Sequence, residues 1–273
     1  MSAGLTEEGR YGPAPPERRS LLISERREEG PYVVLVAEDP QGPLPAPGQF
    51  YMLALAGRWG GGADERPYLP RAISVMSADQ GKLEFMLEAV GPGSTELCQA
   101  VPGDALLALG PLGRGFRSPG AAVPVICGGG IGVAPMVMLA AALGGDAPCA
   151  LGFRDAEHAR AATLIPGAQV ATDDGSAGHA GNAAELLAAI LEGLPAAEVY
   201  ACGPPGMLAA VREVCRSRQA GMQLALESGM ACGFGACYGC VVPMAAGGCS
   251  RLCVDGPVMD GALLADNWEA AYG

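Results

Sequence analysis

The sequence has 273 residues, of which 50% are hydrophobic and 17% are charged, and its formal net charge is −12 at pH 7. A chain of this length buries at least one full core and is expected to divide into two domains. The acidic balance excludes a nucleic-acid partner, because proteins that bind phosphate backbones concentrate lysine and arginine.

The first 19 residues are polar, charged and rich in proline, and they contain no apolar run typical of a signal peptide. We expect residues 1–19 to form a disordered leader. Ten cysteines occur in the chain without such a signal. This combination predicts a reducing cytoplasm, where clustered thiols bind metal more often than they form disulfides.

Residues 20–118 consist of short apolar runs separated by turns rich in glycine and proline, which predicts an antiparallel β-barrel. Within this region "LPRAIS" places Arg71 and Ser74 on one strand. Residues three apart on a strand face opposite sides, so the spacing alone does not bring both to one ligand. Further on, "AVGPGSTEL" places Ser94 and Thr95 at the start of a short helix. This arrangement suits a phosphate, and it suits an ordinary capped helix equally well.

From residue 119 to residue 221 strands alternate with helices, which indicates a parallel α/β sheet. The expected strands are "VPVI", "PCALGF", "AQVAT" and "EVYAC", and the expected helices are "APMVMLAAAL", "NAAELLAAILEG" and "GMLAAVREVCRSRQA". The charge-free segment 121–145 is long enough to span a bilayer. Its central glycines favour a buried strand, turn and helix instead, with Met136 and Met138 in the core.

Three loops of this sheet are expected to meet at the carboxyl ends of the strands, where ligands bind. The loop "CGGGIGVAP" joins a strand to a helix, so that backbone N–H groups from Gly129 to Gly132 face a pyrophosphate. It departs from the strict G-x-G-x-x-G pattern. The loops "TDDGS" and "CGPPGM" follow two later strands. The convergence of all three predicts a nucleotide site.

The last segment, residues 222–273, contains Cys232, Cys237 and Cys240 with the spacing C-x4-C-x2-C. This spacing is the plant-type [2Fe–2S] pattern, in which a fourth cysteine comes from elsewhere. Structural zinc sites carry paired C-x2-C knuckles instead. The segment therefore favours an iron–sulfur cluster over zinc.

The fourth ligand is either Cys249 or Cys253. The runs "VVPM" and "CSRL" are expected to pair as a hairpin around "AAGG", with Val241 opposite Leu252 and Cys240 opposite Cys253. This register favours Cys253 and leaves Cys249 as a spare thiol. The other cysteines lie in or beside apolar segments, where the default is a buried, unreactive thiol.

The combination of R-x-x-S, G-x-G-[ST], the glycine loop and C-G-P resembles the ferredoxin–NAD(P) reductase family. The tail, with "ESGMACGFGACYGC" and "RLCVDGPV", is similar to the electron transfer subunits of type B dihydroorotate dehydrogenases. The resemblance implies a hetero-oligomer in pyrimidine biosynthesis. Its FMN-containing catalytic subunit oxidises dihydroorotate, and electrons pass through the [2Fe–2S] cluster and FAD to NAD⁺. No membrane partner is implied.

The resemblance also assigns residues to each cofactor. FAD is expected at Arg71, Ala72, Ile73, Ser74, Gly91, Gly93, Ser94 and Thr95. The nicotinamide nucleotide is expected at Gly128, Gly129, Gly130, Ile131, Gly132, Thr172, Asp173, Asp174, Gly175, Cys202, Gly203 and Pro204. The cluster is expected at Cys232, Cys237, Cys240 and Cys253. The reductase family usually has tyrosine at the position of Ile73; this departure concerns ring stacking on the flavin and leaves the expectation of flavin binding unchanged.

No catalytic acid or base is expected, because the cofactors carry the electrons. His158 and His179 are expected on the solvated surface. Arg154 and Asp155 follow the second strand, where an acid favours NAD and an arginine accepts the 2′-phosphate of NADP; the resemblance favours NAD. The alternatives are a related subunit of an NAD(P)H:ferredoxin transhydrogenase or a sulfide dehydrogenase, and, in another class, a zinc-binding regulatory module.

Overall fold

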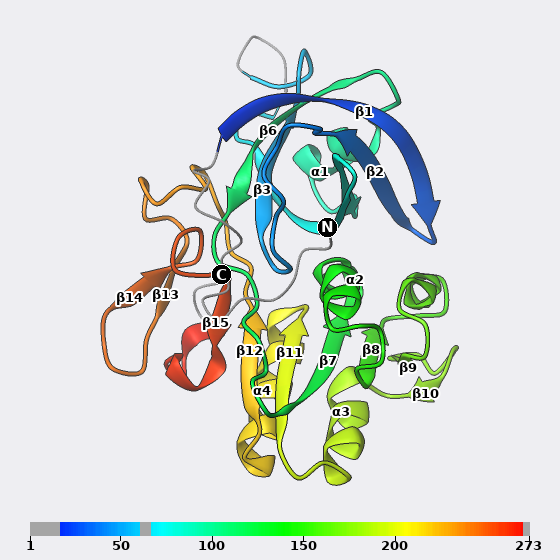
Figure 1. Cartoon of the computed structure of the whole chain (residues 1–273), viewed down its shortest axis with the longest axis vertical. Coiled ribbons are helices and arrows are strands. Elements are labelled where there is room, and N and C mark those ends of the chain that lie inside the picture. The colour runs from blue at the N-terminus through cyan, green and yellow to red at the C-terminus, as the bar shows by residue number, and fades with distance from the viewer. Residues whose placement is uncertain (1–16, 61–66, 270–273) are drawn as a thin grey trace.

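A closed six-stranded barrel forms the first half of the protein in this computed structural model, which describes residues 17–60 and 67–269 (Figure 1). The strands are arranged in the order β1-β2-β5-β4-β3-β6, and closure removes the exposed strand edges. They comprise β1 (Glu17–Glu29), β2 (Tyr32–Glu38), β3 (Phe50–Leu55), β4 (Arg71–Asp79), β5 (Lys82–Leu87) and β6 (Ala105–Leu112), with helix α1 (Pro92–Cys98) between β5 and β6. The first strand begins at Glu17, inside the stretch expected to be a leader. Residues 1–16 of that stretch lie outside the described residues.

A seven-stranded sheet in the order β10-β9-β8-β7-β11-β12-β15 forms the second half. All its strands are parallel except β15, which runs antiparallel to β12. The strands are β7 (Val123–Gly129), β8 (Cys149–Phe153), β9 (Gln169–Thr172), β10 (His179–Ala180), β11 (Ala197–Cys202), β12 (Gly221–Ala225) and β15 (Val258–Asp260). The helical segments are η1 (Gly130–Gly132), α2 (Val133–Ala142), η2 (His158–Leu164), α3 (Ala183–Glu192) and α4 (Pro205–Arg218).

The expected strands and helices of the α/β half are present. Helix α3 begins where the side chain of Asn182 accepts hydrogen bonds from the N–H groups of Ala184 and Glu185, at 3.0 and 3.2 Å. Met136 and Met138 on α2 are buried, as expected. None of the helices in the described ranges has the length and apolar character that crossing a membrane requires.

Helix α2 joins the two halves into one body. It packs against barrel strand β4, and Met138 belongs to the same buried cluster as Leu53 and Phe85 of the barrel. A second cluster combines Met136 with barrel residues such as Met86. The barrel and the sheet are therefore joined by continuous, close-packed side chains.

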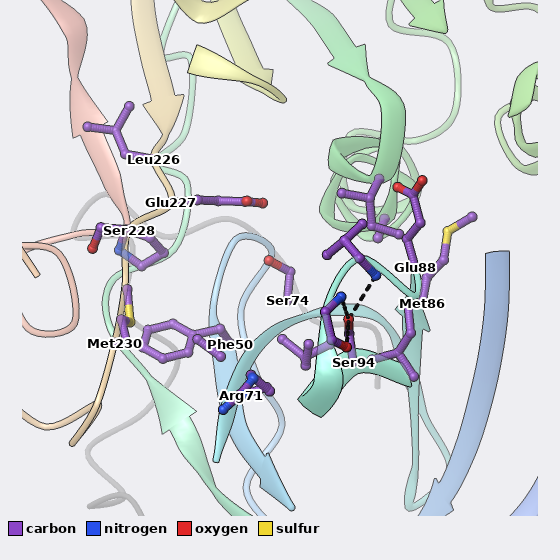
Figure 2. Close-up of a pocket in the computed structure, with 18 of the residues that line it drawn as sticks. Phe50, Arg71, Ser74, Met86, Glu88, Ser94, Leu226, Glu227, Ser228 and Met230 are labelled. Carbon is purple, nitrogen blue, oxygen red and sulfur yellow. Dashed lines mark hydrogen bonds between the residues drawn. The ribbon is translucent and has the colours of Figure 1, made fainter. Parts of the chain in front are cut away.

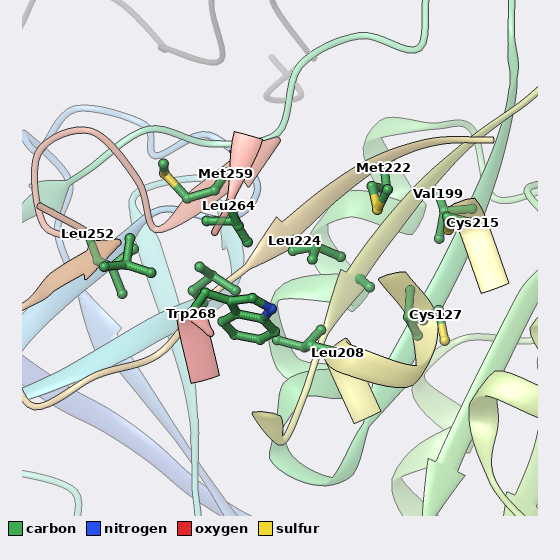
Figure 3. Packing of buried hydrophobic residues seen from close by; sticks show 14 of the residues in the cluster. Cys127, Val199, Leu208, Cys215, Met222, Leu224, Leu252, Met259, Leu264 and Trp268 are labelled. Carbon is green, nitrogen blue, oxygen red and sulfur yellow. The ribbon is translucent and has the colours of Figure 1, made fainter. Parts of the chain in front are cut away.

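The cysteine-rich segment is built into the α/β sheet. Strands β13 (Val241–Pro243) and β14 (Cys249–Arg251) form a separate hairpin, but β15 returns to pair with β12, and η3 (Gly261–Leu263) follows it. Trp268 is fully buried beside Leu208 of α4 and Leu224 of β12 (Figure 3). The sheet thus extends past residue 221, where the sequence led us to end it.

The expected hairpin exists, but its predicted register is wrong by one residue. Val241 pairs with Arg251, and the Cys240 carbonyl accepts a hydrogen bond from the N–H of Leu252 at 2.9 Å. A turn that begins at the Arg251 carbonyl then bends the chain back. As a result, the Sγ atoms of Cys240 and Cys253 lie 3.2 Å apart, so the two side chains meet as predicted although they do not face each other across the ladder.

Arg212 ties helix α4 to the chain that follows β15. Its side chain is 5% exposed. Its guanidinium donates to the carbonyl oxygens of Gly261, Leu264 and Ala265 at 2.9, 2.5 and 3.2 Å. A charged donor makes the stronger class of hydrogen bond, so Arg212 fastens the chain around η3 to helix α4.

Arg212→Met is expected to lower the free energy of unfolding by roughly 2–4 kcal/mol, because buried carbonyl groups lose a charged donor. Arg216→Met is the matched control on the same helix. Its side chain is 44% exposed and pairs with an exposed carboxylate of Asp266, so its loss costs less than about 1 kcal/mol. Urea denaturation of both variants measures the difference. Equal losses would contradict this structural role of Arg212.

Candidate functional site

A cavity of about 320 Å³, which we call the barrel cavity, lies between the barrel and the sheet (Figure 2). The first residues of β4 form one wall, and Arg71, Ala72, Ile73 and Ser74 all line the cavity. At this end β4 pairs only with β3, because its pairing with β5 starts at Val75. Because these four residues have no partner in β5, residues from both faces of the strand reach the cavity. Arg71 and Ser74 therefore share one site in spite of their spacing.

The start of α1 forms a second wall of the barrel cavity. Gly91 is the N-cap residue, so the expectation that Ser94 and Thr95 cap the helix is wrong. Ser94 is the third helical residue, and its hydroxyl accepts from the N–H groups of Val90 and Gly91 at 3.0 and 3.1 Å. Gly91 and Ser94 line the barrel cavity, and Thr95 lines a neighbouring hollow that also includes Gly91.

Arg71 is held in place by Gly93 and Trp59. A Cβ at Gly93 would lie 2.3 Å from Arg71 Nε, so only glycine leaves room for the guanidinium. The same guanidinium lies 5.7 Å from the centre of the Trp59 ring, in a cation–π contact. A fixed guanidinium beside a helix start suits a diphosphate, and Phe50, Ile73 and Leu226 supply an apolar wall for a ring. The donor set fits FAD.

A second cavity, of about 420 Å³, lies over the carboxyl ends of the parallel strands, and we call it the sheet cavity. The loop after β7 contributes Gly129, Gly130 and Ile131. Asp173 follows β9, and Pro204 follows β11. The three loops that were expected to converge do so here. Their backbone N–H groups and small residues fit a dinucleotide.

Other predicted residues of these loops shape the sheet cavity without lining it. Added Cβ atoms at Gly128, Gly132 and Gly203 would lie 2.8 Å from Leu151, 2.4 Å from the Cys202 carbonyl oxygen and 2.7 Å from Met207. Their role is close packing. Burial raises the pKa of the Cys202 thiol well above its usual value.

The loop after β9 is held by its own polar side chains. The Thr172 hydroxyl donates to the Ala177 carbonyl at 2.9 Å. Asp174 accepts from the backbone and hydroxyl of Ser176 at 2.9 and 2.6 Å, across a turn in which Gly175 has φ +71°. Of the four predicted residues in this loop, Asp173 faces the cavity and the other three build the turn.

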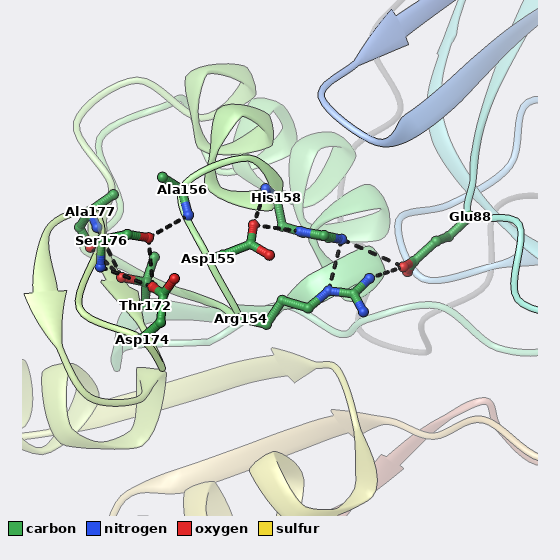
Figure 4. A network of polar contacts seen from close by, with 9 residues as sticks. All are labelled: Glu88, Arg154, Asp155, Ala156, His158, Thr172, Asp174, Ser176 and Ala177. Atoms are coloured by element: carbon green, nitrogen blue, oxygen red, sulfur yellow. Dashed lines mark hydrogen bonds and ion pairs between the residues drawn. The ribbon is translucent and has the colours of Figure 1, made fainter.

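A polar cluster at the mouth of the sheet cavity was not predicted (Figure 4). His158 was expected on the surface but is only 9% exposed, and its ring packs edge-on against Tyr32 at 5.6 Å. It contacts Asp155 and Arg154, and Arg154 reaches Glu88 of the barrel. A histidine three residues after an aspartate was the available local signal. No local sequence signal indicated the contact between Arg154 and Glu88, because it joins two domains. His179 is exposed and pairs with Glu185, as a surface residue does.

The barrel cavity also includes residues that no motif indicated. Met86 lies at the end of β5 and Glu88 directly follows this strand. Glu227, Ser228 and Met230 come from the chain that leads into the cysteine loop. Burial raises the pKa of the Glu227 carboxyl. These residues reach the cavity through the packing of distant segments, which a motif search does not detect.

The cysteine loop brings its thiols together as two pairs. Cys240 and Cys253 lie 3.2 Å apart, and Cys232 interacts with Cys237. Burial by itself raises the pKa of Cys232, but backbone N–H groups of Cys237 and Phe234 outweigh it and lower the pKa to about 6. Positive φ angles at Gly233 and Gly235, +77° and +88°, bend the loop and expose such N–H groups. Cys249 is exposed, and it lies opposite Pro243 in the hairpin.

Two pairs of thiols suit a two-iron cluster, in which each iron takes two thiolate ligands. Within residues 17–60 and 67–269, no group of three or more His, Cys, Asp or Glu side chains already stands around one metal position. The remaining cysteines are buried, and burial raises the pKa of each thiol: Cys98, Cys127, Cys149, Cys202 and Cys215. The donor set thus fits a [2Fe–2S] cluster at Cys232, Cys237, Cys240 and Cys253.

The cysteine loop has one face on the barrel and one face toward solvent. On the inner side a Cβ at Gly233 would lie 2.4 Å from Met52 of β3. On the outer side Phe234 and Tyr238 are 56% and 60% exposed. Arg251 lies 5.0 Å from the Tyr238 ring centre and donates to the Gly235 carbonyl at 3.1 Å. The loop is thus anchored to the barrel while aromatic side chains remain exposed.

Comparison with known proteins agrees with this arrangement. Residues 227–265 match the family model of the iron–sulfur cluster binding domain of dihydroorotate dehydrogenase B. The electron transfer subunit of dihydroorotate dehydrogenase B (NAD(+)) from Geobacillus thermodenitrificans is 35% identical over 89% of this chain and 95% of its own length. The probable subunit of the same kind from Methanopyrus kandleri is 32% identical over 86% of this chain and 87% of its own length.

Solved structures show the same fold at lower identity. The NADH-dependent reduced ferredoxin–NADP oxidoreductase aligns with a TM-score of 0.75 at 20% identity, over 92% of this chain and 91% of its own. The ferredoxin reductase of carbazole 1,9a-dioxygenase aligns with a TM-score of 0.62 at 23% identity, over 79% and 71%. The barrel followed by a parallel sheet is thus a ferredoxin-reductase-like architecture.

Proposed function

The chain belongs to the family of electron transfer subunits of dihydroorotate dehydrogenase B, and from this we propose that it passes electrons from a dihydroorotate-oxidising partner to NAD⁺. It is an oxidoreductase subunit that uses FAD, a [2Fe–2S] cluster and NAD. We further propose that the partner carries FMN, that the two form a cytoplasmic hetero-oligomer, and that the pathway is pyrimidine biosynthesis. The exposed Phe234 and Tyr238 on the cysteine loop support such a docking face.

The observation that carries the proposal is that the barrel cavity shares walls with the sheet cavity and is also lined by a residue next to the cysteine loop. Glu88, Val90 and Ile131 line the barrel cavity and the sheet cavity alike. On the opposite side Met230 lines the barrel cavity two residues before Cys232. A group in the barrel cavity therefore contacts the walls of the nucleotide site and of the cluster loop. An electron relay needs this order, because each step depends on close approach.

The residues of the chain bind and orient while the cofactors supply the electron chemistry. When bound, FAD supplies two-electron hydride exchange and the cluster supplies one-electron transfer. In this proposal Arg71 holds the FAD diphosphate, and the apolar side chains of Phe50 and Ile73 exclude water from the ring; all three residues line the barrel cavity. We propose that the loops after β7, β9 and β11 hold NAD(H) in the sheet cavity, beside the residues that this cavity shares with the barrel cavity. Cys232, Cys237, Cys240 and Cys253 are the proposed ligands of the cluster.

An anaerobic visible spectrum of the isolated chain tests the proposal. We expect overlapping flavin and iron–sulfur bands that lose intensity when NADH is added, because the nucleotide site and both redox sites belong to one chain. NADPH at the same concentration is the control and is expected to act much less, since the relatives of this chain are named as NAD(+) enzymes. A protein that stays colourless after anaerobic reconstitution with FAD, iron and sulfide, and that holds zinc, would contradict the proposal.

A further inference from the structure

The polar cluster at the mouth of the sheet cavity is an ordered chain that points one guanidinium at the barrel (Figure 4). Asp155 Oδ1 lies 2.7 Å from His158 Nδ1 and also accepts from the His158 backbone N–H at 2.9 Å. These two bonds lower the pKa of Asp155. Arg154 Nε donates to His158 Nε2 at 2.8 Å, so the network assigns the imidazole proton to Nδ1. Asp155 thus fixes His158, and His158 fixes Arg154.

The fixed guanidinium ends on a carboxylate of the other domain. Arg154 Nη2 donates to Glu88 Oε1 at 2.5 Å. Arg154 follows β8 of the sheet, whereas Glu88 follows β5 of the barrel. Glu88 is 21% exposed in its side chain and Arg154 is 59% exposed, so solvent and ligands reach the pair. The contact is therefore an interdomain ion pair that can be exchanged.

Both partners of this ion pair line the cavity proposed for the nucleotide. Among the described residues that line the sheet cavity, Arg154 is the only lysine or arginine, while Glu88 and Asp173 are carboxylates. A nicotinamide dinucleotide brings a diphosphate with two negative charges. Such a ligand favours a guanidinium, which binds phosphate oxygens in a two-pronged geometry. In the structure the Arg154 guanidinium is paired with Glu88, so a diphosphate would have to displace this carboxylate to bind it.

We propose that Glu88 is an internal competitor of the nucleotide: NAD(H) binds by taking Arg154 from Glu88, and this exchange opens the interdomain ion pair. The inference rests on the proposed function, because it requires a dinucleotide in the sheet cavity. Glu88 then sets the affinity for nucleotide from the barrel side. Glu88 also lines the barrel cavity. Nucleotide binding in the sheet cavity therefore changes the contacts of a residue in the wall of the barrel cavity.

The test is the dissociation constant of NADH for the full chain with FAD and cluster bound, measured anaerobically by calorimetry. Glu88→Gln is expected to tighten NADH binding about 3- to 10-fold, because an exchangeable ion pair and a nearby negative charge are removed. Arg154→Gln is expected to weaken it about tenfold or more. In the double variant the gain from Glu88→Gln should shrink, since no guanidinium remains to be released.

Glu84→Gln is the matched control. Glu84 lies on β5, the strand that directly precedes Glu88. Its side chain is 27% exposed and pairs with Arg27, but it does not line the sheet cavity. Its replacement should leave NADH binding unchanged. ADP-ribose carries the diphosphate without nicotinamide and should respond to Glu88→Gln as NADH does. Nicotinamide mononucleotide lacks the diphosphate and should not.

Three results separate failure of this inference from failure of the proposed function. If the native chain binds NADH but Glu88→Gln leaves the dissociation constant unchanged or raises it, the competition is wrong and the nucleotide site stands. If the gain is equally large without Arg154, simple charge repulsion explains it and the exchange is overturned. If the native chain binds neither NADH nor ADP-ribose, the proposed function itself is overturned. The FAD content of each variant shows that the barrel cavity is intact.

Discussion

Cys253→Ser is expected to abolish the [2Fe–2S] cluster, whereas Cys249→Ser is expected to leave it intact. Cys253 is 2% exposed, and its Sγ lies 3.2 Å from that of Cys240, in one of the two thiol pairs of the loop. Burial and then Cys240 raise the pKa of its thiol to about 12, as expected for a sulfur that is kept beside another sulfur. Cys249 is exposed at the start of β14 and lies opposite Pro243. A serine hydroxyl is a harder and weaker ligand for iron than a thiolate.

Iron and acid-labile sulfide per bound FAD measure this result, together with the electron paramagnetic resonance signal after reduction by dithionite. Loss of a ligand should exceed the roughly 10- to 100-fold loss in metal affinity that follows removal of a supporting residue. Cys253→Ser should retain FAD and NADH-dependent bleaching of the flavin, because the substitution changes neither the barrel cavity nor the sheet cavity. A cluster that survives Cys253→Ser and disappears in Cys249→Ser would assign the fourth ligand to Cys249 instead.

Gly132→Ala is expected to weaken NADH binding about tenfold or more and to lower the free energy of unfolding by about 1–3 kcal/mol. Gly132 has φ −62°, which any residue adopts, so the effect is steric. Its added Cβ would lie 2.4 Å from the carbonyl oxygen and 2.6 Å from the carbonyl carbon of Cys202. Backbone atoms cannot rotate away as side chains do. The loops after β7 and β11 would have to separate, and the sheet cavity would widen.

Gly206→Ala is the control for this prediction. Gly206 lies in the first turn of α4, close in sequence to the same loop, and a Cβ there meets no atom within 4 Å. Alanine is favoured over glycine in a helix by up to about 1 kcal/mol, so the control should be as stable as the native chain or more so. Calorimetry with NADH and urea denaturation measure both variants. Unchanged binding in Gly132→Ala would show that the approach of the two loops is not needed for the nucleotide.

The sequence predicted what depends on local pattern and on parallel-sheet geometry. Alternating strands and helices imply that loops after parallel strands meet, and Gly129, Asp173 and Pro204 do line one cavity. The meeting of Cys240 and Cys253 was also predicted, although the hairpin register used to argue it was wrong by one. The turn after Arg251, which local pattern does not encode strongly, brings Cys253 back.

The sequence failed where contacts join distant segments. Strand β15 pairs with β12 across the whole cysteine-rich segment, and no short-range signal marks that pairing. The contact between Glu88 and Arg154 depends on how the barrel sits on the sheet. His158 was expected on the surface because its sequence neighbours are polar. In the structure those neighbours form hydrogen bonds with its ring and help to bury it. Ser94 was expected to be the cap because serine favours that position, but Gly91 occupies it and Ser94 bonds back to the turn.

The pairing of β12 with β15 gives the metal centre a second consequence, for folding. The chain between these neighbouring strands, residues 226–257, is a loop closed at its base by the sheet, and all four proposed ligands lie within it. A cluster bound by these thiols is a cross-link inside that loop. Like a disulfide, it reduces the conformational entropy of the unfolded chain, and like any ligand of the native state it adds its binding free energy to folding. Oxidative loss of the cluster is therefore expected to destabilise the edge of the nucleotide-binding sheet in addition to removing an electron carrier.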